Sequence, residues 1–231
     1  MKKTYFIIVG IIIIHVSLFA QQNSNTWYIG GQANFYGNTN DILDTLYSST
    51  TQSQTSMIIP NVGYYIAENL SVGINIKYGI AHAVQTQNYT LTNSNKTNTY
   101  TYHTTSYGGG LFIRKQIELH EKFYLFVQGE LNYMYQFQKN TKESTDTTVV
   151  YPTSDPAYQE LTTHIVNISL FPGFVYKVSP KLGIQSSIGN IFFNNSIIEN
   201  QSLLYDNHNK TSNYGISLNM DSFYLGLAYY F

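Results

Sequence analysis

Apolar and polar residues alternate with a period of two in segment after segment of this chain. The range 122–138 shows the pattern most clearly, because Leu125 and Leu131 alternate with polar residues such as Gln128 and Glu130. Successive side chains of a β-strand point to opposite faces. Beyond the first residues, no run reaches the roughly 20 apolar residues that a membrane-spanning helix requires. The pattern therefore predicts strands with one apolar and one polar face.

Eight predicted strands account for this alternation. They are Thr26–Tyr36, Gln54–Ile66, Leu70–His82, Thr104–Ile117, Lys122–Gln138, Leu161–Lys177, Lys181–Asn194 and Ser212–Phe231. Three expected connections are short, namely Ala67–Asn69, Glu118–Glu121 and Val178–Pro180. The other four are long and polar, namely Gly37–Ser53, Ala83–His103, Lys139–Glu160 and Asn195–Thr211. Short and long connections alternate strictly, as the periplasmic turns and extracellular loops of outer-membrane barrels do.

The polar faces distinguish a membrane barrel from a soluble one. A soluble β-sandwich or lipocalin-like barrel would put its apolar face inward and a charged face outward. Here charged residues make up 11% of the chain, less than half of the roughly 25% found in ordinary soluble domains. The faces opposite the apolar ones consist mostly of Gly, Asn, Gln, Ser and Tyr. The sequence therefore predicts an all-β fold, an eight-stranded antiparallel up-and-down transmembrane β-barrel.

The last nine residues, Phe223–Phe231, form an apolar predicted strand that ends on an aromatic residue. One face carries only large apolar or aromatic side chains, namely Phe223, Leu225, Leu227, Tyr229 and Phe231. The last strand of a membrane barrel has an apolar outer face that ends in an aromatic girdle at the bilayer interface. We therefore expect Phe231 to lie at the periplasmic interface.

The start of the sequence has the features of a secretory signal peptide. Two lysines follow Met1, an apolar stretch continues to Phe19, and Ala20 completes a plausible cleavage site. We expect residues 1–20 to be a signal peptide for the Sec pathway, cleaved after Ala20, and residues 21–231 to form the barrel domain. An uncleaved membrane anchor is the alternative, although the apolar stretch is short for a spanning helix.

Composition narrows the possible chemistry. The chain has no cysteine, which excludes disulfides, thiol catalysis and a lipoprotein anchor. The formal net charge is −1, and no basic segment argues for nucleic-acid binding. No phosphate loop, dinucleotide fingerprint or paired-carboxylate motif is present, so we expect no cofactor.

A strand–turn–strand pattern occurs twice in the sequence, at Ile59–Gly73 and at Pro172–Gly183, and an F-hydrophobic-R pattern occurs in Leu111–Arg114. These segments resemble the hairpins and strands of the small outer-membrane β-barrel proteins common in Bacteroidetes, which are eight-stranded barrels of the OmpA and OmpX type. The end of the chain resembles the carboxy-terminal signal that the barrel-assembly machinery reads, carried here by Tyr224, Gly226, Tyr229 and Phe231. The resemblance implies an architecture, an outer-membrane location and an assembly route. It implies no activity, because members of the family mostly lack an assigned one.

Three charged residues lie on the polar faces of otherwise uncharged strands, namely Lys77, Arg114 and Glu130. The interior of an eight-stranded barrel is just wide enough for side chains to fill, and buried charges are costly unless they are paired. We predict an interior ion-pair network in which Glu130 lies between Arg114 and Lys77. The alternative is that one or more of these residues lies near a rim and is solvated.

Four histidines, His82, His103, His164 and His208, are expected near extracellular strand ends or in the last long loop. Such residues could bind a divalent metal or act as acid–base groups. Their spacing is irregular and no short ligand pair supports a site, so we expect no metal.

Two histidine–serine pairs raise the possibility of a lipid A acyltransferase or deacylase. His103 is close in sequence to Ser106, and His164 is close to Ser169. A serine nucleophile needs an adjacent base, but such pairs arise by chance in a chain this rich in serine. We therefore expect no catalytic residues.

The sequence favours a non-enzymatic protein with a structural role in the outer-membrane lipid, or with a surface-binding role through polar extracellular loops. Any extracellular ligand is left unidentified. Tyr47, Tyr89, Tyr100 and Tyr205 could provide a sugar-binding platform in those loops. A narrow pore or small-solute transporter is the first alternative, although a filled lumen would conduct little. A lipid A-modifying enzyme is the second.

Overall fold

The structure is a computed structural model that describes residues 26–44, 47–91, 94–144, 160–202 and 205–231. The predicted signal peptide and its cleavage site lie outside these residues, as does most of the predicted connection Lys139–Glu160. Within the described ranges, no helix is long and apolar enough to cross a membrane.

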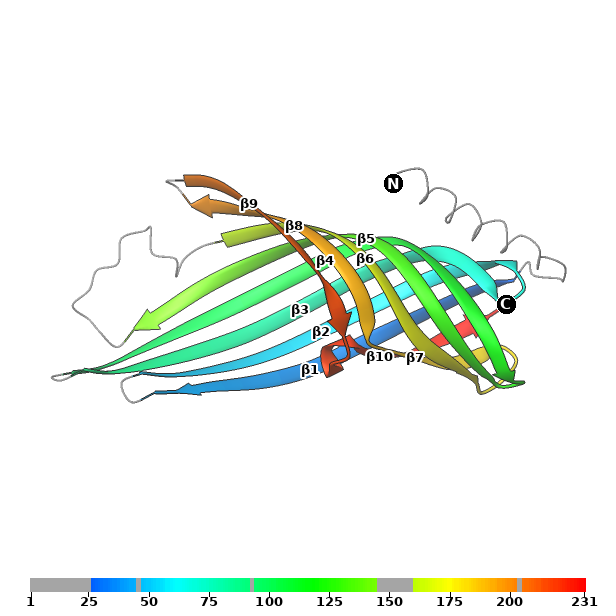
Figure 1. Cartoon of the computed structure of the whole chain (residues 1–231), viewed down its shortest axis with the longest axis horizontal. Helices are drawn as coiled ribbons and strands as arrows, with labels where there is room; N and C mark the ends of the chain where they lie inside the picture. The colour runs from blue at the N-terminus through cyan, green and yellow to red at the C-terminus, as the bar shows by residue number, and fades with distance from the viewer. Residues whose placement is uncertain (1–25, 45–46, 92–93, 145–159, 203–204) are drawn as a thin grey trace, which may run out of the picture.

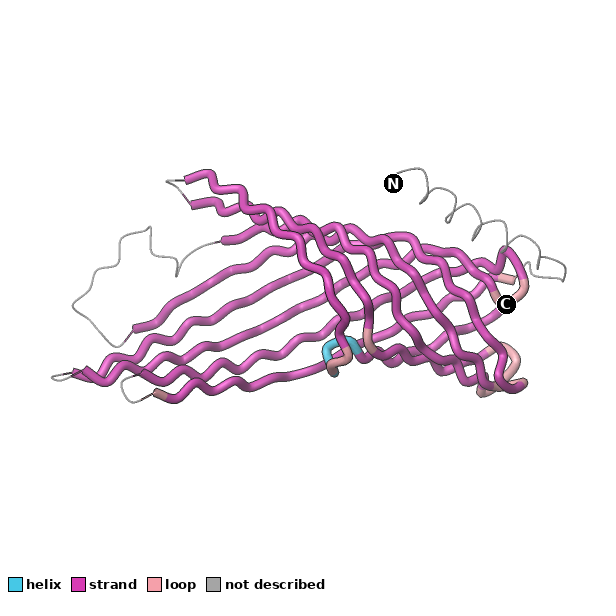
Figure 2. The backbone as a smooth tube through the Cα atoms, in the orientation of Figure 1, coloured by secondary structure: helices cyan, strands magenta, loops and turns pink. Residues whose placement is uncertain are grey.

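Antiparallel strands make up nearly all of the described chain (Figure 2). The strand segments in these ranges are β1 (Trp27–Leu43), β2 (Tyr47–Ala67), β3 (Leu70–Leu91), β4 (Ser94–His120), β5 (Phe123–Ser144), β6 (Glu160–Lys177), β7 (Leu182–Ile188), β8 (Asn190–Ser202), β9 (Tyr205–Ser217) and β10 (Phe223–Tyr230). A short 3-10 turn, η2 (Met220–Ser222), precedes β10.

The wall closes at the end of the barrel that carries the short turns. Strands β1 to β6 are successive antiparallel neighbours. At this end β6 pairs with β7, β7 with β10, and β10 with β1. Eight strands therefore surround the lumen and leave no free sheet edge at this level. The predicted eight-stranded antiparallel barrel is confirmed. Its three short turns are present, but β4 continues to His120, so the second turn is Glu121–Lys122 rather than Glu118–Glu121.

The predicted seventh and eighth strands are each split in two. Gly189 separates β7 from β8 and has a φ angle of 70°, a left-handed conformation that glycine adopts without a steric penalty. Turn η2 separates β9 from β10, and the Ser222 carbonyl accepts a hydrogen bond from the Gly189 amide at 3.2 Å. The two breaks therefore lie side by side in the wall.

Beyond these breaks the wall is open on one side. Strand β8 stays paired with β6, and β9 stays paired with β8. The register between β1 and β10, however, ends where Ala33 meets Leu225. Among the described strands β9 has no second neighbour, and the β8–β9 hairpin diverges from β1 and β2 (Figure 1). We call the gap between residues 35–43 of β1 and Tyr205–Ser217 of β9 the seam.

The predictions of long loops at Gly37–Ser53 and Ala83–His103 were wrong, because both ranges are mostly strand. Most of Asn195–Thr211 likewise belongs to β8 and β9. Strands β2 and β3 have 21 and 22 residues, about twice the ~9–11 residues that span a bilayer. Polar composition suggested loops, but Thr and Tyr favour strands, and each strand finds backbone partners in its neighbours. We call residues 36–43, 47–55, 81–91, 94–104 and 138–144 the extension.

The two faces of the wall have the chemistry of a membrane barrel. The interior buries polar side chains, among them Arg114, Gln185 and Asn132. The outer face exposes a belt of large apolar residues, among them Ile29, Phe35, Ile58, Ile74, Ile76, Leu111, Ile113, Leu131, Ile168, Leu170, Ile191, Phe193, Leu225 and Leu227. An outward apolar belt around a polar interior is the arrangement of a lipid-embedded barrel and the reverse of a soluble one.

Candidate functional site

Lys77 and Glu130 meet inside the barrel. Lys77 on β3 and Glu130 on β5 both point inward, and Lys77 Nζ lies 2.7 Å from Glu130 Oε2. Two amides also donate to the carboxylate, Gln128 Nε2 at 2.6 Å and Asn132 Nδ2 at 2.8 Å. The side chains of the two charged residues are only 11% and 3% exposed. Burial of this pair is tolerable because an opposite charge and further donors surround the carboxylate.

Arg114 does not contact Glu130 directly, contrary to the predicted network. The register of β4 and β5 pairs Arg114 with Gln128, and Glu130 with Phe112. Arg114 Nε donates to Gln128 Oε1 at 2.5 Å, and Nη1 donates to Gln185 Oε1 at 2.8 Å. Gln128 thus connects the guanidinium to the carboxylate. The sequence reasoning missed both glutamines because it considered only charged partners for a charged residue.

Arg114 forms the centre of a plug at the short-turn end. Its guanidinium carbon lies 4.2 Å from the ring centre of Phe126, 5.7 Å from Tyr28 and 5.9 Å from Phe112. The faces of aromatic rings attract cations electrostatically. Tyr230 packs on Tyr28, with ring centres 5.7 Å apart. A charge and a cluster of rings therefore fill this end of the lumen.

A cavity of about 270 Å³ lies on the other side of the Lys77–Glu130 pair, toward the extension. Its lining combines these two residues with the apolar side chains of Met57, Met134 and Ile165. Residues of both wall breaks, Gly189, Asn190 and Ser222, also line it. We call this space the lumen cavity. The lumen cavity therefore combines apolar and polar side chains and reaches the point where the wall opens.

The inner face of the extension gathers hydroxyl and amide groups. The Tyr102 hydroxyl donates to Gln85 Oε1 at 3.4 Å, and Gln85 Nε2 donates to Ser49 Oγ at 3.3 Å. Burial raises the pKa of Tyr102 above its ordinary value, and the neighbouring Tyr100 adds to the rise. The hydroxyl of Tyr102 therefore remains a protonated donor at neutral pH.

Three tyrosines of the possible sugar-binding platform lie on this same inner face. The rings of Tyr47 and Tyr89 pack with their centres 5.2 Å apart, and Tyr100 is the cross-strand neighbour of Gln85. The side chain of Tyr205 lies outside the described part of the structure. These residues belong to strands rather than to loops, so the sheet fixes their spacing.

The histidines do not converge on one point. His82 and His103 are cross-strand neighbours with ring centres 4.6 Å apart. His164 instead has its Nδ1 2.5 Å from the Tyr133 hydroxyl, and the side chain of His208 is outside the described part of the structure. In the described ranges, no group of three or more His, Cys, Asp or Glu residues could hold a metal ion.

The two histidine–serine pairs are not formed. His103 and Ser106 are an odd number of positions apart, so they face opposite sides of β4. Ser106 is buried in the interior, whereas His103 is exposed on the outer face. His164 and Ser169 are separated in the same way on β6, where Ser169 is buried. Neither serine therefore faces the base that its activation would require.

The residues of the predicted assembly signal occupy both faces of β10. Tyr229 and Phe231 lie on the outer face with ring centres 5.3 Å apart, as part of an aromatic girdle at the short-turn end. Tyr224 is half-buried on the inner face. Gly226 packs so closely on the Gly31 carbonyl that a Cβ atom would clash, so packing alone requires this glycine. Reading of the signal by the assembly machinery stays a prediction.

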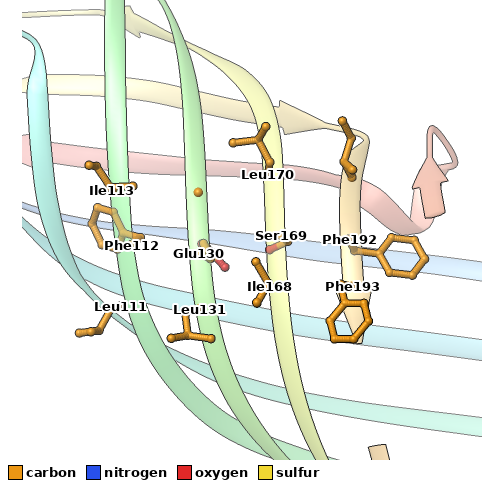
Figure 3. A pocket seen from close by; sticks show the side chains of 12 residues that line it. Leu111, Phe112, Ile113, Glu130, Leu131, Ile168, Ser169, Leu170, Phe192 and Phe193 are labelled. Atoms are coloured by element: carbon orange, nitrogen blue, oxygen red, sulfur yellow. The ribbon is translucent and has the colours of Figure 1, made fainter. Parts of the chain in front are cut away.

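A wide hollow of about 600 Å³ lies on the outer wall across β4, β5, β6 and β8 (Figure 3). It exists because Gly129 has no side chain to fill the space between Ile113 and Leu170. Leu111, Leu131 and Ile168 are among its other apolar lining residues. The hollow lies within the outward apolar belt, so we expect lipid rather than a soluble ligand to fill it.

Comparison with known proteins finds similar folds. Similar solved structures include a major outer membrane protein from Thermus thermophilus (12% identity, covering 90% of this chain and 100% of that one, TM-score 0.42). Others are OprG from Pseudomonas aeruginosa (11%, 91% and 97%, TM-score 0.43) and Ail, the attachment invasion locus protein of Yersinia pestis (12%, 91% and 100%, TM-score 0.25). No protein-family model matches the chain, and the comparison with curated proteins finds no match.

Likenesses this distant carry no information about activity. The closed eight-stranded wall, the outward apolar belt and the polar, plugged interior are properties of this chain itself. Together they make it a small outer-membrane β-barrel protein.

Proposed function

We propose that this protein is a non-enzymatic surface-interaction barrel of the outer membrane, which binds its partner with the extension. In this proposal the signal peptide is cleaved after Ala20, the assembly machinery recognises the end of β10, and the extension faces the outside of the cell. The extension itself carries the proposal, because polar strands continue far beyond the apolar belt as a hydrogen-bonded sheet.

The chemistry of the inner face supports an uncharged, hydroxyl-rich ligand such as a neutral glycan. Tyrosines provide large rigid surfaces, and small polar side chains provide adaptable hydrogen bonds, as in antibody binding sites. Tyr47 and Tyr89 supply the paired rings, while Gln85 and Ser49 supply donors and acceptors. The strands hold these groups in place, which lowers the entropy lost on binding.

An array of neutral and anionic oligosaccharides, probed with the purified barrel in detergent micelles, tests this function. We expect binding to neutral oligosaccharides, with at least a tenfold loss for Tyr89→Ala. Thr86→Ala, on the outer face of the same strand, is the matched control and should bind like the parent. Failure to bind any array member, or equal losses in the two variants, would contradict the proposal.

Two other functions predict different results. A pore would give a steady open conductance in a planar bilayer, whereas the plug around Arg114 supports a closed lumen. A lipid A-modifying enzyme would change the mass of lipid A in cells that express the protein, and His103→Ala or His164→Ala would abolish that change. We expect neither a steady conductance nor a mass change.

A further inference from the structure

The seam begins within the apolar belt, not above it. Phe35 of β1 is 74% exposed on one side of the seam, and Tyr214 and Ile216 of β9 are 83% and 72% exposed on the other. Leu218, which follows β9, is 74% exposed. Large apolar side chains at such exposure identify both borders as lipid-facing. The wall is therefore open at the level of the outer part of the bilayer.

An open wall at this level has a physical consequence. Each unsatisfied backbone N–H or C=O group in hydrocarbon costs several kcal/mol, so unpaired backbone at membrane depth is tolerated only against protein or a water-containing cavity. Strand β9 and residues 35–43 of β1 have no partner across the seam among the described strands. The inward side chains of the borders, such as Asn38 and Asn213, are polar and exposed. The seam thus connects lipid with the polar lumen.

Specific contacts hold the end of the seam next to the closed wall, near Asn34 and Ser222, so this end is not frayed. We call it the foot of the seam. Asn34 Nδ2 donates to the carbonyl of Asp221 at 3.2 Å and to that of Phe223 at 2.5 Å. The Gly189 amide donates to Ser222 in the same turn, from a left-handed conformation. These bonds tie turn η2, which joins β9 to β10, both to β1 and to the break at Gly189.

The lumen cavity lies directly at this foot, since Ser222 and Gly189 belong to its lining. Two methionines, Met57 and Met134, give it an adaptable apolar wall, and the Tyr224 hydroxyl contacts the Met57 sulfur at 3.8 Å. Amides, among them Gln136 and Asn167, and the Lys77–Glu130 pair provide hydrogen-bonding groups. Its volume of about 270 Å³ is close to the lower limit of roughly 300 Å³ for small-molecule sites.

We propose that the lumen cavity binds small amphipathic molecules, with an apolar body and a hydrogen-bonding head, that exchange with the bilayer through the seam. The apolar body contacts the two methionines and Ile165, and the head contacts the lumen amides. This activity is independent of ligand binding by the extension, because it uses other residues at another depth of the barrel.

A tryptophan reporter in the cavity tests the proposal. The chain has a single Trp and no Cys, so Trp27→Phe combined with Met134→Trp gives one emitter in the cavity. Gly37→Cys and Ile216→Cys, added to this background, allow the seam to be closed with a reducible bis-thiol linker. The protein is placed in lipid nanodiscs, and 10-bromodecanol is added as the membrane-partitioning quencher. Reporters at Ile76, on the lipid face, and at Phe126, in the plug, are the positive and negative controls.

We expect bromodecanol to quench the cavity reporter, the linker to reduce this quenching at least fivefold, and reduction of the linker to restore it. The reporter at Ile76 should be quenched whether or not the linker is present, and the reporter at Phe126 should not respond. Two results would overturn the proposal. One is a cavity reporter that bromodecanol does not quench. The other is quenching that the linker leaves unchanged, because the molecule would then enter from the open end of the barrel.

Discussion

The short-turn half of the barrel and the half that carries the extension differ in how their strands are paired and in what fills the lumen. In the short-turn half every strand has two neighbours, and the lumen contains Arg114, its aromatic cluster and the Lys77–Glu130 pair. In the other half β9 and the end of β1 each keep one neighbour. The polar faces of the extension mostly carry amides and hydroxyls.

This contrast predicts that the two halves contribute differently to stability. A closed wall around the paired Lys77 and Glu130 resists unfolding, because every buried hydrogen bond lost there costs free energy. An open wall with exposed polar groups contributes less to stability and leaves groups available for ligands. Substitutions of similar chemistry should therefore have very different effects in the two halves.

The largest effect is expected for Glu130→Gln. It leaves the Lys77 ammonium buried without its carboxylate, and breaking a buried pair costs about 3–5 kcal/mol. Urea unfolding of the barrel in lipid vesicles, followed by the fluorescence of the single tryptophan, measures the loss. The double variant Lys77→Met/Glu130→Gln should recover part of it, because no buried charge remains.

The pair Lys139–Glu160 at the edge of the extension provides the matched control. Its nitrogen–oxygen distance is 4.0 Å and the two side chains are 60% and 52% exposed. Exposed pairs contribute roughly 0–1 kcal/mol, so Glu160→Gln should leave the unfolding curve nearly unchanged. Equal losses for Glu130→Gln and Glu160→Gln would break the comparison between the two halves.

An intermediate effect is expected for Gly189→Ala, at the border between the halves. A side chain at this left-handed position costs about 1–2 kcal/mol, and a Cβ atom would also lie 2.5 Å from Leu218 Cδ2. The same unfolding assay measures the loss. Gly37→Ala is the control in an open position, where the nearest atom to an added Cβ is 3.4 Å away. A stable Gly189→Ala barrel would mean that the break in the wall is not held by this conformation.

The smallest effect is expected for Tyr102→Phe in the extension, within about 0.5 kcal/mol at neutral pH. Because folding raises the pKa of Tyr102 above 10.0, its contribution is fully present below pH 10 and is lost as the pH rises beyond that value. Tyr102→Phe should therefore reduce the alkaline loss of stability. Parallel curves for the parent and the variant between pH 9 and 12 would contradict this assignment.

The alternation of residues was sufficient to predict the closed half of the barrel. The first six predicted strands match observed strands to within three residues at the short-turn end, because a period of two leaves one choice of outward face, whereas the breaks in the seventh and eighth were not predicted. The extension was not predicted, because strands such as Gln85–Leu91 carry polar residues on both faces and lose the periodic signal. Their backbone hydrogen bonds come from neighbouring strands, so the residue pattern of a single segment does not predict them.

The sequence predicted which charged residues point into the interior, but not all of their partners. Lys77, Arg114 and Glu130 all point inward, but the choice of partners depends on the register between β4 and β5. A shift of two residues would have paired Arg114 with Glu130 instead of Gln128. The seam and the lumen cavity had no sequence signal beyond Gly189, since a glycine in a strand can indicate a bulge, a bend or a close contact.

The sequence by itself determined that the chain forms strands, which face of each strand meets lipid, and that the wall closes around a polar interior. These follow from the local period and from the low charge of the polar faces. Tertiary structure alone decided which charges pair, where the eighth strand leaves the wall and which tyrosines share a face. These depend on the register between strands and on contacts between distant strands. Alternation restricts a register only to shifts by an even number of residues.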